Sequence, residues 1–492
     1  MASLLKQIHK VPFIQYLFLG FIGALSTFAF SPFDFKLAIP ITLIVLIYTI
    51  VNSNNFIDAL KCAFSWGLGY WVSGTGWLIV SVYYYGNTNI IISVSIIFLM
   101  GILLSAVFIA PFAAAKLLEL NQSIFFKSMF LASLLTLMEL SRFLFLGGFP
   151  WLLPGLVFMD TLGQILIPNI GVYGASFIIY FYSSFIALCI VNKKKNLFIL
   201  GIFCLAILLP YQNHQKEAFS ESLNLSIIQP SLDPFKKYKL ESRLNIEDTL
   251  VSLTNKNTNA DLIIWPESPL PYIKSSPEMV NLLTRIEEAP TVLSGAWEYK
   301  KNSLQNTMTI LGTNQSYSKR HLVPFGEYVP FEGLLRGLIK FFDMPMSSVS
   351  GGHSKQGLFE ISNFKILGMI CFDIAFPLSY LREIRGSDFI VNISNDTWFG
   401  SSYGPDQHLQ IVRARALESN KWIARGTSDG ISAIIDNKGT IVDILEKGRK
   451  AFLNGTIYKT PGSSFFYRHG YIIAPLLSFI LLIYVLVLRL RK

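Results

Sequence analysis

Three side chains in the second half of the chain could together carry out acyl transfer. Glu267 and Cys371 lie at the ends of segments that look like buried strands, and Lys319 lies in a polar turn just after Tyr317. Attack of a thiol on an acyl carbonyl needs a nucleophile, a base that takes its proton and a positive group that stabilises the oxyanion. Cys371, Glu267 and Lys319 supply one of each, in that order.

Each of these residues also has an ordinary structural explanation. A glutamate after Pro266 is commonly a solvated loop residue, and a lysine in a turn is commonly a surface charge. A cysteine at the end of a strand often serves as a small apolar core residue. Residue types and spacing alone therefore leave both interpretations open.

The cysteine distribution singles out Cys371. Cys62, Cys189 and Cys204 fall in or beside apolar runs, whereas Cys371 is the one cysteine of the 211–465 segment. Exported domains usually carry paired cysteines, and this one has no partner in its own segment. Such a lone thiol is either buried and inert or reactive and functional.

The segment around these residues reads as an α/β domain. Short apolar runs bounded by turn residues predict strands, and amphipathic stretches between them predict helices. The predicted strands are 223–229, 261–265, 291–298, 306–311, 366–371, 388–394, 431–435 and 440–445, and the predicted helices are 240–256, 276–287 and 406–420. Strand ends in such sheets hold functional side chains rigidly while leaving them accessible.

The composition divides the chain into a membrane part and a globular part. Hydrophobic residues make up 52% of the 492 residues and charged residues only 15%, with a mean hydropathy of +0.47. The apolar excess lies in 1–210 and near the C-terminus. We therefore expect a transmembrane bundle at 1–210, a catalytic domain at 211–465, and a last span with a basic tail at 466–492.

We expect about eight membrane-spanning helices, because a span needs about 20 apolar residues. The predicted spans are 11–31, 37–52, 63–83, 89–112, 125–145, 162–191, 196–210 and 471–488. Lysine and arginine before the first span, around 193–195 and after the last span predict a cytoplasmic face for both termini. The 211–465 domain then lies outside the cytoplasm. An uncleaved N-terminal anchor is favoured over a signal peptide, because the apolar stretch is long and more spans follow.

The net charge of +10 is explained by these loop anchors rather than by nucleic acid. The chain has no basic stripe, zinc-knuckle spacing or phosphate-binding loop. The six histidines form no ligand-spaced cluster, so we expect neither a metal nor a cofactor.

Three motifs carry a resemblance to a known superfamily. The runs are WPESP at 265–269, YSKRHLVPFGEYVP at 317–330 and ILGMICFDIAFP at 366–377. In order and content they resemble the three signatures of the nitrilase superfamily, with Glu267, Lys319 and Cys371 in the catalytic positions. The resemblance implies an αββα sandwich.

Flanking segments narrow the resemblance to the apolipoprotein N-acyltransferase family. They are GFPW at 148–151, MPMSSVSGG at 344–352 and NDTWFGSSYGPDQHLQ at 395–410. The resemblance covers essentially the whole chain and implies eight membrane helices with a periplasmic catalytic domain in the bacterial inner membrane. It also implies a ping-pong reaction. A phospholipid, expected to be phosphatidylethanolamine, acylates Cys371, and the diacylglyceryl-cysteine of an apolipoprotein then accepts the chain on its α-amine.

The resemblance assigns roles residue by residue. Cys371 is the nucleophile, Glu267 the general base and then the acid, and Lys319 the oxyanion donor, with Glu327 expected to orient Lys319 or support Glu267. Supporting positions depart from the family pattern: Phe372 and Asp373 replace the common Tyr and Glu, and Tyr238 stands where Trp is usual. We expect a monomer that works at the membrane surface.

Two alternatives compete with this interpretation. A membrane-tethered amidase acting on a lipid-linked amide would keep the same triad and use water as the second nucleophile. A transporter with a degenerate domain would be expected to show matched inverted halves, which this chain lacks. The 322–346 segment is too apolar for a well-solvated loop, so it is either a helix on the domain core or an arm that enters the bilayer.

Overall fold

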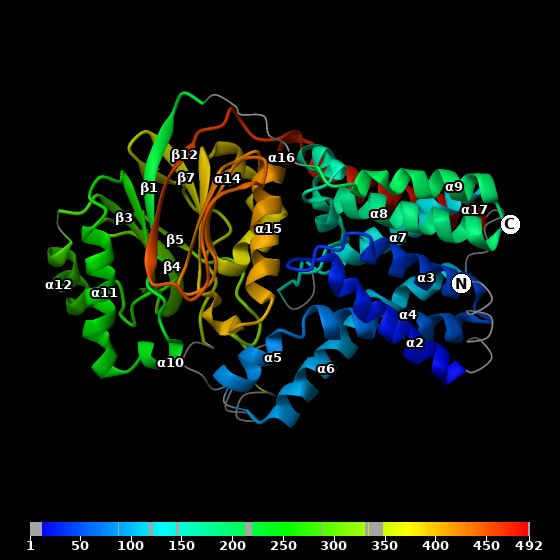
Figure 1. Cartoon of the computed structure of the whole chain (residues 1–492), viewed down its shortest axis with the longest axis horizontal. Helices are drawn as coiled ribbons and strands as arrows, with labels where there is room; N and C mark the ends of the chain where they lie inside the picture. The colour runs from blue at the N-terminus through cyan, green and yellow to red at the C-terminus, as the bar shows by residue number, and fades with distance from the viewer. Residues whose placement is uncertain are drawn as a thin grey trace. The chain divides into compact units, whose positions relative to one another are not determined.

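The computed structural model describes residues 12–490 except 87, 118–121, 144–146, 212–218, 287, 330–332 and 334–347. The chain forms two compact units (Figure 1). The helical unit consists of the chain up to Ile79, Asn89–Gln212 and the chain from His469 onward. The sandwich unit consists of Val80–Thr88 and Asn213–Arg468. Most of the apolar 322–346 segment lies outside the described residues.

The helical unit is built mainly from apolar helices. Its α-helices are α2 (Pro12–Leu25), α3 (Ala38–Asn52), α4 (Phe56–Gly74), α6 (Ile90–Phe108), α7 (Ile124–Ser141), α8 (Ile167–Val191), α9 (Lys195–Cys204) and α17 (Ile473–Leu490). Many large apolar side chains on α6, α9 and α17 are exposed, including Ile91, Phe203 and Phe479. Large exposed apolar faces indicate contact with something other than water.

Three described helical stretches are long and apolar enough to cross a membrane: Ile90–Lys116, Ile124–Ser141 and Leu162–Val191. Four further apolar stretches are shorter: Phe13–Ala29, Ala38–Asn52, Lys195–Leu208 and Gly470–Val485. The span predicted at 63–83 differs most from the structure. The corresponding helix, α4, starts at Phe56, where the Asn55 side chain accepts from the backbone N–H of Asp58, and it ends at Gly74.

The sandwich unit contains two six-stranded sheets that pack face to face. The first has the order β12-β1-β2-β3-β4-β5 and the second the order β11-β10-β9-β8-β7-β6. The first sheet is made of β1 (Ser222–Gln229), β2 (Leu262–Ile264), β3 (Thr291–Lys300), β4 (Ser303–Ile310), β5 (Ser316–Ser318) and β12 (Ala451–Tyr458). The second is made of β6 (Phe359–Ile361), β7 (Phe364–Ile370), β8 (Phe389–Ser394), β9 (Ile423–Thr427), β10 (Ser432–Ile435) and β11 (Ile441–Leu445).

Helices cover the outer faces of both sheets (Figure 1). On the first sheet, α11 (Arg243–Asn255) and α12 (Pro277–Arg285) bury an apolar cluster that includes Leu250, Leu282 and Trp265. The second sheet carries α14 (Leu381–Gly386) and α15 (Gly404–Ser419), with the short α16 (Phe465–Arg468) beside them. This is the αββα sandwich that the resemblance implies. Its two inner faces meet where a Cβ on Gly426 would lie 3.2 Å from Ile227 and Ile264.

A short segment far away in sequence also belongs to the sandwich unit. Val80–Thr88, which includes the single π-helical turn Ser81–Tyr85, folds with residues 213–468. The Ser81 hydroxyl donates to the carbonyl oxygen of Trp398 over 2.8 Å. The predicted membrane span at 63–83 instead includes Val80–Tyr83, because these residues are apolar.

Candidate active site

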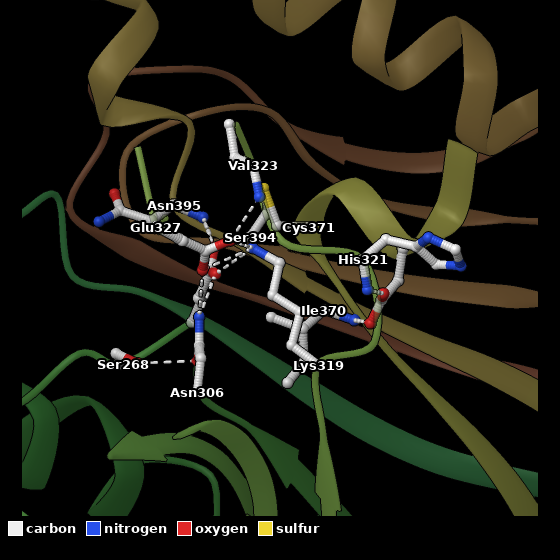
Figure 2. A network of polar contacts seen from close by, with 12 residues as sticks. Ser268, Asn306, Lys319, His321, Val323, Glu327, Ile370, Cys371, Ser394 and Asn395 are labelled. Carbon is white, nitrogen blue, oxygen red and sulfur yellow. Dashed lines mark hydrogen bonds and ion pairs between the residues drawn. The ribbon is translucent and has the colours of Figure 1, made fainter. Parts of the chain in front are cut away.

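Glu267, Lys319 and Glu327 meet in one buried cluster. Lys319 and Glu327 are labelled in Figure 2. Glu267 follows β2, Lys319 follows β5, and both are buried. The Lys319 ammonium lies 3.2 Å from Glu267 Oε1 and 2.9 Å from a carboxylate oxygen of Glu327. Glu327 thus makes the contact with Lys319 expected of a residue that orients it.

Asn306 on β4 joins the two carboxylates. Its Nδ2 donates to Glu267 Oε1 over 2.7 Å and to Glu327 Oε1 over 3.1 Å. The Ser268 hydroxyl donates to Asn306 Oδ1 over 3.2 Å, and the backbone N–H of Lys319 donates to the Asn306 carbonyl over 2.9 Å. Asn306 therefore fixes the positions of both carboxylates and of the lysine relative to one another. No motif in the sequence pointed to it.

Backbone donors complete the hydrogen bonding of the two carboxylates. The N–H of Asn395 donates to Glu267 Oε2 over 2.8 Å, and the N–H of Val323 donates to Glu327 Oε2 over 2.9 Å. Every residue except proline has a backbone N–H, so these two donors depend on the path of the main chain and not on the residue type. Both carboxylates are therefore held as fixed acceptors around Lys319, as buried charges require.

Cys371 lies at the turn that follows β7. Its φ of 49° is in the left-handed region, where residues other than glycine are strained. Cys371 is partly exposed, whereas Phe372 and Asp373 beside it are buried. A strained turn at the end of a central strand presents the thiol while the neighbouring backbone stays packed.

Charged groups of both signs act on the Cys371 thiol. Although part of the Cys371 residue is exposed, the protein around its sulfur desolvates the thiolate. This desolvation, followed by the negative charge of Glu267, raises the pKa of the Cys371 thiol well above its usual value, and Lys319 opposes the rise. Burial alone would lower the pKa of Lys319, but Glu267 and Glu327 outweigh burial and raise it well above its usual value. The resting site therefore holds a neutral thiol beside a permanent cation.

Asp373 connects the nucleophile turn to the lysine turn. Its Oδ1 accepts from the backbone N–H groups of Arg320 and His321 over 3.2 and 2.8 Å. Its Oδ2 accepts from the Tyr317 hydroxyl over 2.8 Å and from the Ile370 N–H over 3.2 Å. Asp373 thus supports the site by holding two chain segments together, without touching Lys319 or Glu267.

The other two supporting positions lie at the edge of the cluster. Phe372 is buried, and its ring meets that of Phe376 edge-on, with centroids 4.9 Å apart. The Tyr238 side chain is 44% exposed and lies beside the Lys237 ammonium, which is 5.3 Å from the ring centroid. Lys237 itself was not predicted. It is buried and donates to the Ser268 carbonyl, and burial lowers its pKa to about 8 against the opposing charge of Glu267.

Comparisons with known proteins show the family of this chain. The model of the apolipoprotein N-acyltransferase N-terminal domain matches residues 22–185, and the carbon-nitrogen hydrolase model matches 224–458. An apolipoprotein N-acyltransferase of Pseudomonas syringae is 32% identical over 460 residues, covering 88% of this chain and 89% of that protein. The chain belongs to the apolipoprotein N-acyltransferase family. Another member of the family, from Pasteurella multocida, is 32% identical and covers 90% of this chain and 89% of its own length.

The family assignment confirms the resemblance drawn from the motifs, and the carbon-nitrogen hydrolase match confirms the nitrilase-like sandwich. Among solved structures, a carbon-nitrogen hydrolase superfamily protein of Xanthomonas campestris matches at 19% identity with a TM-score of 0.39, covering 48% of this chain and 91% of its own. Within the described part of the chain, no group of three or more His, Cys, Asp and Glu side chains could hold a metal ion.

Proposed function

We propose that this member of the apolipoprotein N-acyltransferase family moves an acyl chain from a phospholipid to an apolipoprotein through a thioester on Cys371. The proposed acceptor is the α-amine of an N-terminal diacylglyceryl-cysteine. The proposal is supported by the buried cluster of Glu267, Lys319 and Glu327, because the charges of Glu267 and Lys319 act on the Cys371 thiol. Base, cation and nucleophile are the parts that acyl transfer requires.

In the first half-reaction Glu267 takes the thiol proton as sulfur attacks the ester carbonyl. The raised pKa of Cys371 means that this proton leaves only as the sulfur–carbon bond forms. Lys319, which Glu267 and Glu327 keep charged, stabilises the oxyanion. The carbon–oxygen bond of the ester then breaks, Glu267 returns its proton to the leaving alcohol, and a lysophospholipid departs.

In the second half-reaction the α-amine attacks the thioester. An α-ammonium group has a pKa of about 7.7–8.0, so a substantial fraction is neutral near pH 8, whereas a lysine side chain stays protonated. Glu267 takes one proton from the attacking amine and passes it to the leaving sulfur. A site with a single carboxylate base therefore favours an N-terminal amine over lysine.

We further propose that the helical unit spans the inner membrane eight times, with both termini in the cytoplasm and the sandwich unit in the periplasm. The exposed apolar side chains of α6, α9 and α17 support a lipid-facing surface. The lysines at 193–195 and the basic residues at 489–492 support a cytoplasmic position for their loops. Phosphatidylethanolamine is the proposed donor, and the working form is a monomer.

A transfer assay tests this function. Full-length protein in phospholipid vesicles is given a diacylglyceryl-cysteine peptide, and the mass of the peptide is followed. Wild type should add one acyl chain to the free-amine peptide and none to its N-acetylated version. Cys371→Ala should be inactive, whereas the matched control Cys204→Ala should match wild type. Release of free fatty acid into water without peptide acylation would support the amidase alternative and overturn the proposal.

A further inference from the structure

A second buried polar cluster lies behind Cys371, and the mechanism above does not use it. Asp396, His408 and Arg425 are all buried, as is Ser394 at the end of β8. Arg425 Nη2 lies 2.5 Å from Asp396 Oδ2, and the Ser394 hydroxyl donates to Asp396 Oδ1 over 2.6 Å. Asp396 thus accepts from a fixed cation and from a hydroxyl that faces the site.

His408 fixes the other side of this cluster. Its Nε2 lies 3.3 Å from the Cys371 carbonyl oxygen, which can only accept, so Nε2 carries the ring proton. Burial, followed by the charge of Arg425, lowers the pKa of His408, which leaves a single proton on the ring. Its Nδ1 lies 3.2 Å from both Asp396 Oδ1 and Arg425 Nη2. With the ring proton on Nε2, Nδ1 accepts from Arg425, because a guanidinium group can only donate. His408 holds the backbone of the nucleophile and is not a proton source.

Asp396 stays ionised in this setting. Although burial alone would raise its pKa, the charge of Arg425 and then the hydrogen bond from the Ser394 hydroxyl hold it well below its usual value. A permanent carboxylate needs donors, and the Ser394 hydroxyl is one of them. The single proton of Ser394 is consequently committed to Asp396 while Cys371 is a neutral thiol.

Ser394 is the neighbour of the nucleophile across the two strands. Parallel pairing of β7 and β8 places Ile370 opposite Ile393, so the next residues, Cys371 and Ser394, follow at the same end of neighbouring strands. Both are drawn in Figure 2. The Ser394 hydroxyl lowers the pKa of the Cys371 thiol, whereas the charge of Asp396 raises it. Two anions, the Asp396 carboxylate and the Cys371 thiolate, therefore compete for one hydroxyl proton.

We propose that Ser394 is a catalytic hydrogen-bond donor that switches between Asp396 and the sulfur of Cys371 as negative charge moves onto that sulfur. In the resting enzyme the Ser394 O–H points to Asp396 Oδ1. When Glu267 removes the thiol proton, the hydroxyl rotates and donates to Sγ without leaving its oxygen. Asp396 meanwhile keeps its ion pair with Arg425, so the lost hydrogen bond leaves no unpaired buried charge.

The switch acts in both half-reactions. It stabilises the attacking thiolate in the first and the leaving thiolate in the second, and it returns to Asp396 once the sulfur is a neutral thioester. This role deepens the proposed function and rests on it. It also makes a prediction about the thiol alone, because proton loss from Cys371 can be measured without any lipid or peptide.

The test is the pH profile of iodoacetamide alkylation at Cys371, read by mass spectrometry of the Cys371 peptide from full-length protein. The charged groups whose fields reach this thiol are Glu267, Lys319 and Asp396, and they are unchanged in Ser394→Ala. That variant should move the alkylation midpoint up by about one pH unit, the scale of a lost hydrogen bond to a charged group. Ser394→Thr, which keeps the hydroxyl, should retain the wild-type profile.

Thr427→Val is the matched control for loss of a buried hydroxyl. Thr427 is the register partner of Ser394 on β9, and its hydroxyl bonds Gln229 and Ser432. This variant should leave the midpoint unchanged. An unchanged or lower midpoint for Ser394→Ala, or an equal shift for Thr427→Val, would overturn the proposal.

Asp396→Asn provides a second arm if Ser394→Ala does not fold. Removing the competing anion should free the Ser394 proton for sulfur and lower the alkylation midpoint, and an unchanged or raised midpoint contradicts the switch. The proposed function and the Ser394 switch can fail separately. If Cys371→Ala still acylates peptide, the proposed function is wrong whatever the alkylation profile. If Ser394→Ala leaves the profile unchanged while Cys371→Ala is inactive, only the switch is wrong.

Discussion

Asn306 Nδ2 lies 2.7 Å from Glu267 Oε1, so a neutral amide on β4 holds the proposed general base in place. The same nitrogen reaches Glu327 at 3.1 Å. One side chain thus spaces two carboxylates around the Lys319 ammonium. Because an amide adds no charge, it fixes their geometry without neutralising either of them.

Asn306→Ala should lower the acylation rate by about tenfold or more, since a hydrogen bond to a charged group contributes about 1.5–3 kcal/mol. Asn306→Asp should be worse, because a third carboxylate would face Glu267 and Glu327. The control is Asn454→Ala, an exposed asparagine on β12. Rates are measured by peptide acylation, and wild-type activity in Asn306→Asp would contradict this role.

Substitutions at Lys319 and at Glu327 should slow acylation of Cys371 by different amounts. Lys319→Met removes the cation at similar length and should cost at least about 2.7–4 kcal/mol of transition-state stabilisation, the scale of a lost oxyanion donor. Glu327→Gln should cost less, because it orients Lys319 without facing the oxyanion. Single-turnover acylation of Cys371 measures both, with thermal unfolding checked in parallel because Lys319 is a buried cation. A larger loss for Glu327→Gln would reverse the two roles.

Asp373 should matter for stability as well as rate. Asp373→Asn replaces one carboxylate oxygen by an N–H₂ group that faces backbone or tyrosine donors, so about 1–3 kcal/mol of stability should be lost for the unsatisfied groups. Thermal unfolding in detergent measures the change. Asp388→Asn is the control, because Asp388 accepts one backbone N–H, from Lys365, and pairs with Lys459 at a more exposed site. Equal effects of the two changes would argue against a special role for Asp373.

The membrane topology gives a prediction that does not depend on catalysis. An alkaline phosphatase fusion placed within 211–465 should be active, because this enzyme folds only outside the cytoplasm, and a fusion at residue 492 should be inactive. The physical reason is the retention of the basic clusters at 193–195 and 489–492 on the cytoplasmic side. The opposite activity pattern would invert the orientation.

Much of the sandwich could be predicted from the sequence because its central strands are continuous apolar runs. All eight predicted strands have counterparts in the structure, from β1 to β11. Four strands were missed: the three-residue strands β5 and β6, which are too short to show a pattern, and the longer strands β9 and β12. In β9 the buried Arg425 and Gly426 break the apolar pattern, and β12 alternates only weakly between buried and partly exposed residues. Both are strands because their neighbours in the sheets require it.

Some residues of the candidate site could also be predicted from the sequence, and others could not. Glu267, Lys319, Glu327 and Cys371 lie in motifs, so their types and order were visible in the sequence. Asn306 looks like an ordinary polar residue in a strand, and the N–H groups of Asn395 and Val323 have no side-chain signature at all. The contacts of His408 and Arg425 depend on how α15 and β9 pack behind Cys371. Such groups are recognised only when the fold brings them together.

The most direct test of the central claim is the intact mass of the full-length protein after incubation with phospholipid alone. We expect a species heavier by one acyl chain, mapped to Cys371, that persists in water. It should disappear rapidly when a diacylglyceryl-cysteine peptide with a free α-amine is added, and it should survive addition of the N-acetylated peptide. No adduct on Cys371, or equally fast loss with the blocked peptide, would contradict the account.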